Sequence, residues 1–138
     1  MALQLQFGVL TRNRRLDAIE VELGAAPVLT IWNGAIPANC AAANAGTVLV
    51  TVTLPSDWMS NASGGTKVIN PTGAPWSDPT ADNSGTALHF RIHKAGGGTC
   101  ELQGTVGMSG TDMIIDNNVI VAGQTVSITS FTLTDANA

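Results

Sequence analysis

The chain has 138 residues, a length at which one domain buries roughly 68% of the surface that its unfolded form exposes. Only 12% of the residues are charged and 44% are hydrophobic, which excludes a disordered chain and a protein that coats nucleic acid. No apolar run approaches the 18 or so residues of a membrane span, and the start MALQLQFGVL lacks the basic region of a signal peptide. We therefore expect a soluble protein that folds in the cytoplasm and binds neither nucleic acid nor membrane.

The first element that the sequence predicts is an amphipathic helix over about residues 12–23. Leu16, Ile19 and Leu23 recur at the three- and four-residue spacing that places side chains on one helical face. Gly24 follows where a glycine commonly ends a helix. The helix and the residues before it, 1–24, form a predicted N-terminal arm.

The charge of the chain is unevenly distributed around this helix. Arg12, Arg14 and Arg15 are three of the six basic residues. Residues 1–15 therefore carry a charge of +3 and the remaining residues carry −7, which gives the net charge of −4. Basic side chains at a helix start oppose the helix dipole at a cost of about 0.3–1 kcal/mol each. Two interpretations stay open: a solvated helix start, partly compensated by Asp17, or arginines that contact carboxylates of another subunit.

After the helix the hydrophobic periodicity changes to two, as in β-strands. Residues 28–32 form a short apolar strand, and Asn33-Gly34 is a strong turn signal. Residues 35–46 are a connector of small residues. Residues 47–54 then alternate valine and leucine with threonine, which predicts a half-buried strand.

Residues 55–86 contain four of the six prolines and read as a long, loop-rich middle. A short strand over residues 66–70 interrupts it. Such a stretch is uncommon inside a compact domain, so we expect part of it to reach away from the body. Trp58 and Trp76 lie in these polar segments, where three roles are open: anchors of a subunit interface, ordinary packing, or a ligand platform.

Residues 88–93 and 100–106 are predicted to form a β-hairpin around a glycine-rich loop. A slip of one residue would place each apolar side chain against a polar one, so the register is well specified. The expected pairs are Ile92 with Leu102, Leu88 with Val106, His93 with Glu101, and Phe90 with Gly104, whose missing side chain leaves room for the ring.

The C-terminal part adds further strands over residues 113–115, 119–121 and 125–134. In the last strand the apolar parity changes near Thr129-Ser130, which predicts a β-bulge or a change of sheet. Together these patterns predict a mainly β domain over residues 25–138, an antiparallel sandwich or barrel-like fold of seven to eight strands, preceded by the one helix.

No catalytic or metal-binding pattern emerges from the remaining residues. His89 and His93 would lie about 13 Å apart on a strand, too far to share one ion. The Asp78–Gly85 loop lacks the acidic spacing of a calcium loop. A disulfide between Cys40 and Cys100 is open but disfavoured in a reducing compartment. We therefore predict a protein without enzymatic activity, metal or cofactor.

Two motifs carry a resemblance to a known family. The P-A-N-C-A segment at Pro37–Ala41 and the run D-N-N-V-I-V-A-G-Q-T-V at Asp116–Val126 are its most specific parts. With ALHFRI and CELQGTVG, they make the chain from Arg12 to Thr134 similar to a family of small virion structural proteins of tailed phages and prophages.

This resemblance implies a head decoration (cement) protein, a homotrimer on the major capsid protein of a virion assembled in the bacterial host cytoplasm. Arg12, Arg14 and Arg15 would then meet the acidic capsid surface, and Trp58 and Trp76 would lie at interfaces. The alternative is a tail, fibre or baseplate component that binds host-surface glycans through Trp58, Trp76 and the Asp78–Asp82 loop.

Overall fold

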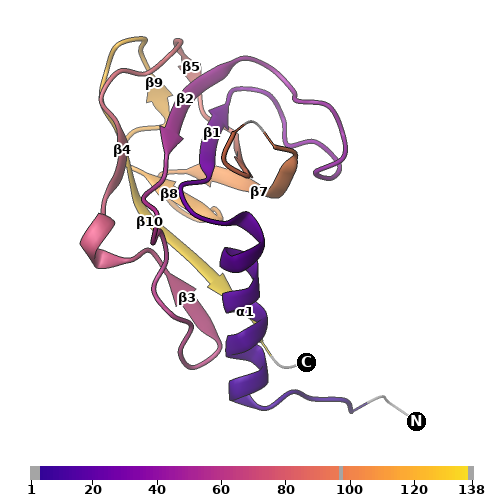
Figure 1. Ribbon diagram of the computed structural model, residues 1–138. Coiled ribbons are helices and arrows are strands. Elements are labelled where there is room, and N and C mark those ends of the chain that lie inside the picture. The colour runs from indigo at the N-terminus through magenta and orange to yellow at the C-terminus, as the bar shows by residue number, and fades with distance from the viewer. Residues whose placement is uncertain (1–3, 97, 137–138) are drawn as a thin grey trace.

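The structure, a computed structural model, describes residues 4–96 and 98–136. It confirms a mainly β fold with one helix at the N-terminus (Figure 1). The helix α1 spans Val9–Leu23 and begins three residues before the predicted start. The strands are β1 Val28–Trp32, β2 Val48–Thr53, β3 Thr66–Val68, β4 Trp76–Asp78, β5 Gly85–Thr86, β6 His89–His93, β7 Cys100–Gly107, β8 Met113–Ile115, β9 Val119–Ile120 and β10 Val126–Thr134, with a short 3-10 helix η1 at Pro71–Gly73.

Eight strands form one curled sheet, a half-barrel, in the order β2-β1-β6-β7-β8-β10-β3, with β4 paired to β10 beside β3. The strands β5 and β9 form a separate two-stranded sheet. The pairs within the described residues are antiparallel except β7 with β8, whose parallel ladder joins Val106 to Met113 and Gly107 to Ile114. Asp112 fixes the intervening loop by accepting hydrogen bonds from the backbone and hydroxyl of Thr105 at 2.8 and 2.9 Å.

The predicted β6–β7 hairpin is confirmed over most of its length. Ile92 pairs with Leu102 and Phe90 with Gly104. A Cβ at Gly104 would lie 2.7 Å from the Phe90 ring, so the glycine makes the room that the sequence indicated. The register shifts at the hairpin end, however, so that His93 pairs with Cys100 rather than with Glu101.

The last strand also contains the predicted irregularity. Between Ile128 and Ser130 the register of β10 against β8 shifts. Val126, Ile128 and Phe131 are all buried although Phe131 has the opposite parity. The bulge thus keeps apolar side chains inward along the whole strand.

The middle of the chain does not reach away from the body, contrary to the prediction. Val68 of β3 pairs with Thr132, and Trp76 of β4 pairs with Ile128, so both strands extend the main sheet along one side of β10. The prolines in this stretch shape the connection through η1, which Asn70 caps by accepting a hydrogen bond from the backbone of Thr72.

The helix is docked on the β body through its predicted apolar face. Leu16 and Leu23 are buried, and Ile19 packs partly buried against the core. The Lys67 side chain of β3, which is fully buried, binds Asp17 at 2.8 Å and Glu20 at 2.7 Å. Apolar packing and this ion cluster therefore hold α1 against β3 (Figure 1).

Candidate interaction surfaces

The three predicted arginines differ in where the structure places them. Arg12 donates a hydrogen bond to the backbone carbonyl of Asp135 at 3.0 Å, and Arg15 pairs with the Asp135 carboxylate at 3.2 Å. Both arginines therefore bind Asp135 of the same chain, near its C-terminal end. Arg14 is exposed beside them, and its role at a subunit or capsid contact stays a prediction.

Of the three roles left open for Trp58 and Trp76, the structure supports ordinary packing. Trp58 is fully buried and Trp76 is 2% exposed. Their rings lie 5.9 Å apart, and Trp76 contacts Phe131, which in turn meets Phe90 edge-on. Both tryptophans thus belong to an aromatic cluster at the centre of the core. Neither offers an anchor or a sugar platform at the surface.

The part of β6 that carries His89 and Arg91 is buried as well. His89 is inaccessible and Arg91 is 2% exposed. The connector 35–46 folds over this face. Arg91 donates hydrogen bonds to the Asn44 side chain at 2.8 Å and to the Asn39 carbonyl at 3.1 Å. Gln103 accepts a third hydrogen bond from the Arg91 guanidinium. The role of Arg91 is therefore to fasten the connector rather than to bind a ligand.

Cys40 and Cys100 are joined in a disulfide, with their Cα atoms 5.1 Å apart, which corrects the expectation that a reducing compartment would leave them unpaired. The bond ties the connector to the start of β7. It borders a cleft of about 570 Å³ that also includes Arg91 and His93.

Both histidines lie on β6, where His89 is buried and His93 is partly exposed. Burial lowers the pKa of His89, and its Nδ1 lies 2.6 Å from the Gly34 carbonyl, so the neutral ring donates there. Burial and the charge of Arg91 lower the pKa of His93. Within residues 4–96 and 98–136, no group of three or more His, Cys, Asp or Glu is placed to hold a metal ion.

The carboxylates of the Asp78–Gly85 loop bind groups of the protein itself. Asp78 accepts hydrogen bonds from the backbone of Thr51 and Thr80, and Asp82 accepts one from the Thr51 hydroxyl at 2.7 Å. These carboxylates fix the loop against β2.

Exposed apolar side chains gather on the arm and the outer face of α1. Leu5 is 77% exposed, and Leu10 and Val21 are 74% and 81% exposed. Leu10 and Val21 lie three helical turns apart on one side, away from the buried Leu16. We call Leu10, Arg14 and Val21 the outer helix face. The spacing of Leu10 and Val21 in the sequence indicates this second apolar face, but the predicted stripe of Leu16, Ile19 and Leu23 did not include it.

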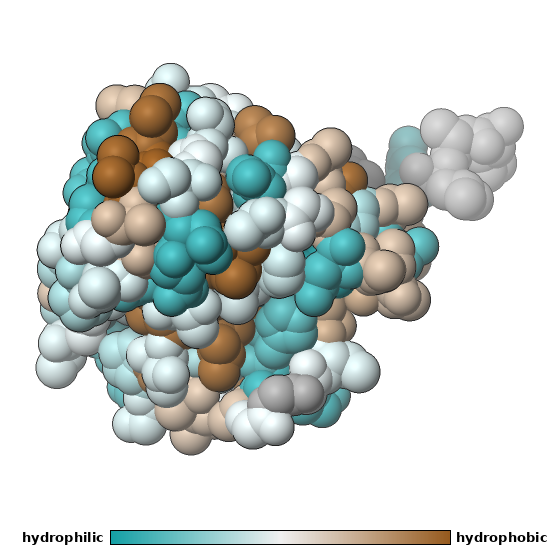
Figure 2. All heavy atoms as spheres, turned by 90° about the horizontal axis from the view of Figure 1, so that it is seen from above, coloured by the Kyte–Doolittle hydropathy of each residue, from teal (hydrophilic) through white to brown (hydrophobic). Residues whose placement is uncertain are grey.

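Elsewhere, exposed apolar residues are scattered. Figure 2 shows the end of the molecule that lies uppermost in Figure 1, where hydrophobic side chains form small separate patches among hydrophilic ones. Val119 and Val121, in and after β9, are 58% and 59% exposed. Small exposed apolar patches of this size are common on soluble proteins and need no partner.

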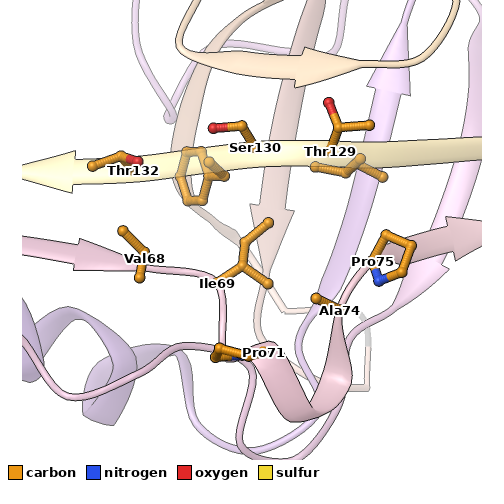
Figure 3. A pocket seen from close by; sticks show the side chains of 10 residues that line it. Val68, Ile69, Pro71, Ala74, Pro75, Thr129, Ser130 and Thr132 are labelled. Carbon is orange, nitrogen blue, oxygen red and sulfur yellow. The ribbon is translucent and has the colours of Figure 1, made fainter.

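A groove of about 480 Å³ lies along β10, between β3 and β4. Its lining is apolar or hydroxyl-bearing, and no lining residue is charged. Figure 3 shows the lining residues around the chain segment that passes through η1. The residues are Val68, Ile69, Pro71, Ala74, Pro75, Ile128, Thr129, Ser130, Phe131 and Thr132.

Comparison with protein-family models, with curated proteins and with solved structures finds no match to this chain. In the part of the chain that the structure describes, the helix is too short and too polar to cross a membrane.

Proposed function

We propose that this protein is a non-enzymatic structural protein of a tailed-phage virion, and most specifically a head decoration protein that binds the outer capsid surface and stabilises the joints between capsomers. The observation that carries the proposal is the outer helix face. Leu10 and Val21 are largely exposed on a helix whose opposite face is already used to complete the core.

The helix is suited to act as a fixed contact element. Lys67 holds Asp17 and Glu20 from within the body, and Arg15 pairs with Asp135 at the start of the helix. A surface that is rigid before binding loses little conformational freedom on association. Apolar side chains presented in this way can add contact area to a shell without any reaction.

The exposed Arg14 gives the outer helix face a positive charge between its two apolar residues. An acidic capsid surface would complement that charge and orient the protein during binding. Interfaces of about 1,600 Å² repeated over a shell oppose its expansion. These features support a decoration role, which the family resemblance of the sequence also implies.

The glycan-binding alternative loses the platform on which it depended. Trp58 and Trp76 are buried, and Asp78 and Asp82 are engaged with β2 and its loops. A tail location without glycan binding is an outcome that the following experiment distinguishes.

The test uses particles produced by the phage or prophage that encodes the chain. Mass spectrometry of purified particles would detect the protein, and electron microscopy of particles carrying a tagged copy would place it on head or tail. Particles lacking it should lose DNA at a lower temperature. Absence of the protein from particles, or its presence on the tail alone, would contradict the proposal.

A matched pair of variants links the binding to the outer helix face. Val21→Asp should abolish addition of the protein to particles that lack it, whereas Val119→Asp, at a similarly exposed valine, should bind as the wild type does. Equal binding by both variants would exclude this face as the contact.

A further inference from the structure

The groove along β10 exists because two strands pair with one side of β10 but leave a gap between them. Trp76 of β4 pairs with Ile128, and Val68 of β3 pairs with Thr132. Residues 129–131 have no strand beside them on that side. The chain between β3 and β4 bows outward through η1 and leaves the apolar hollow seen in Figure 3.

The N-terminal arm, residues 4–8, offers side chains of matching chemistry. The segment Leu3 to Phe7 reads L-Q-L-Q-F, an alternation that places leucine and phenylalanine on one side of an extended chain. Leu5 is 77% exposed, and Phe7 is 41% exposed with the Arg15 guanidinium over its ring. No charged residue lies in this arm, and none lines the groove, so the contact between arm and groove would desolvate no charge of either segment.

The arm of one molecule does not lie near its own groove. In Figure 1 the chain leaves the start of α1 on the side away from η1 and β4. An arm that occupies the groove therefore comes from a different molecule.

We propose that the groove along β10 binds the N-terminal arm of a second copy of this chain, with Leu5 entering the apolar hollow. The inference rests on the proposed structural role, to which contacts between copies of the chain would add. An arm-to-groove contact joins two different surfaces, so it generates a closed ring when the rotation between copies permits closure. A three-membered ring would give the homotrimer that the family resemblance implies.

Charged residues beside the two surfaces agree with this pairing. Asp57 is exposed and accepts a hydrogen bond from Asn70, next to η1 and the groove. Arg14 is exposed on the helix that follows the arm. An arm seated in the groove would bring Arg14 of one copy toward Asp57 of the other, a complementary pair beside an apolar contact.

Cross-linking between two chains, each with one added cysteine, tests the contact directly. A chain with Leu5→Cys and a differently tagged chain with Val68→Cys are mixed and mildly oxidised. We expect a mixed disulfide between the two chains, formed at least ten times faster than with a matched Val119→Cys chain. The native cysteines are already bonded to each other, and unaltered protein serves as the background control.

The oligomeric state supplies a second measurement. Sedimentation of the purified full chain should show self-association that Leu5→Asp and Val68→Asp each weaken about 10- to 100-fold, as expected for loss of one buried aliphatic side chain. Val119→Asp should leave it unchanged. Because these experiments use purified protein, they give a result whether or not the protein is found in particles.

A monomeric wild-type chain at high micromolar concentration would overturn the inference. So would equal cross-linking of the Leu5→Cys chain to the Val68→Cys and Val119→Cys chains, or self-association that both groove and arm Asp variants retain. Near-ultraviolet spectra, which report on the buried Trp58 and Trp76, would identify any variant that fails to fold, and the cysteine experiment then decides.

Discussion

The ion cluster beneath α1 allows a sharp test of what holds the helix to the body. Lys67 is fully buried and donates to Asp17, to Glu20 and to the carbonyl of Ser60 at 2.9 Å. Burial lowers the pKa of Lys67, but the two carboxylates more than compensate and the net pKa is raised. The two carboxylates thus favour the charged form of the lysine in spite of its burial.

The perturbation is the double substitution Asp17→Asn with Glu20→Gln, which leaves a buried ammonium without a carboxylate. Removing the partners of a buried charge costs about 3–5 kcal/mol, a large part of the roughly 5–15 kcal/mol that stabilises a typical domain.

Lys67→Met should cost less. The carboxylates that it leaves are 39% and 19% exposed, and they retain backbone donors at Ala62 and Met59. We expect a loss of about 1 kcal/mol. A triple variant combines Lys67→Met with the double substitution Asp17→Asn and Glu20→Gln. It should be more stable than the double variant, because methionine can be buried without a counter-charge.

Urea unfolding followed by tryptophan fluorescence measures these free energies. The control is Lys94→Met, whose partner Glu22 is 66% exposed and for which we expect no measurable change. The reasoning would be refuted by a triple variant as unstable as the double, or by a double variant that resembles the control.

Three further outcomes are expected from the geometry. Gly104→Ala would place a Cβ 2.7 Å from the Phe90 ring and should cost about 1–3 kcal/mol in urea unfolding, while alanine at the unobstructed Gly8 should not. Replacing Cys40 and Cys100 together by serine releases a link of sequence separation 60 and should lower stability by about 4 kcal/mol; a thermal midpoint equal to that of the wild type would contradict it. The hydrogen bond from Lys67 lowers the pKa of Asp17 below its ordinary 3.8. The stability that Asp17 contributes is therefore present above pH 3.8 and is lost as the pH falls through the lower pKa of the folded state. In this acid range the free energy of unfolding of Asp17→Asn should depend less on pH than that of the wild type.

Local patterns were sufficient to predict several elements of the fold. The alternation in β6 and β7 fixed which residues face each other, because a slip would expose apolar side chains, and Gly104 opposite Phe90 is found as predicted. The parity change in β10 likewise indicated its bulge. These features depend on residues close in sequence or joined by one short turn.

Contacts between distant segments were not predictable in the same way. Trp58 and Trp76 lie among polar and turn-forming residues. Trp76 enters the core because β4 pairs with the distant strand β10, and Trp58 is placed beside it by the bridge between Met59 and Ile69. Arg91 and His89 alternate with apolar residues as a solvent-facing side would. The connector that covers them is recognisable only once Asn39 and Asn44 are seen to accept hydrogen bonds from Arg91.

The distribution of exposed apolar residues is the feature that most separates an assembly protein from a solitary domain. Val119 and Val121 are exposed at the end of a small sheet, apart from the helix and arm, and carry no implication by themselves. Leu5, Leu10 and Val21 instead follow one continuous stretch of chain whose helical part is anchored by Lys67 and Arg15. A folded chain could have placed polar residues at these positions without disturbing its core, since none of the three contributes to it. The exposure of Leu10 and Val21 on an anchored helix is the observation that our proposal of contacts with neighbouring molecules accounts for.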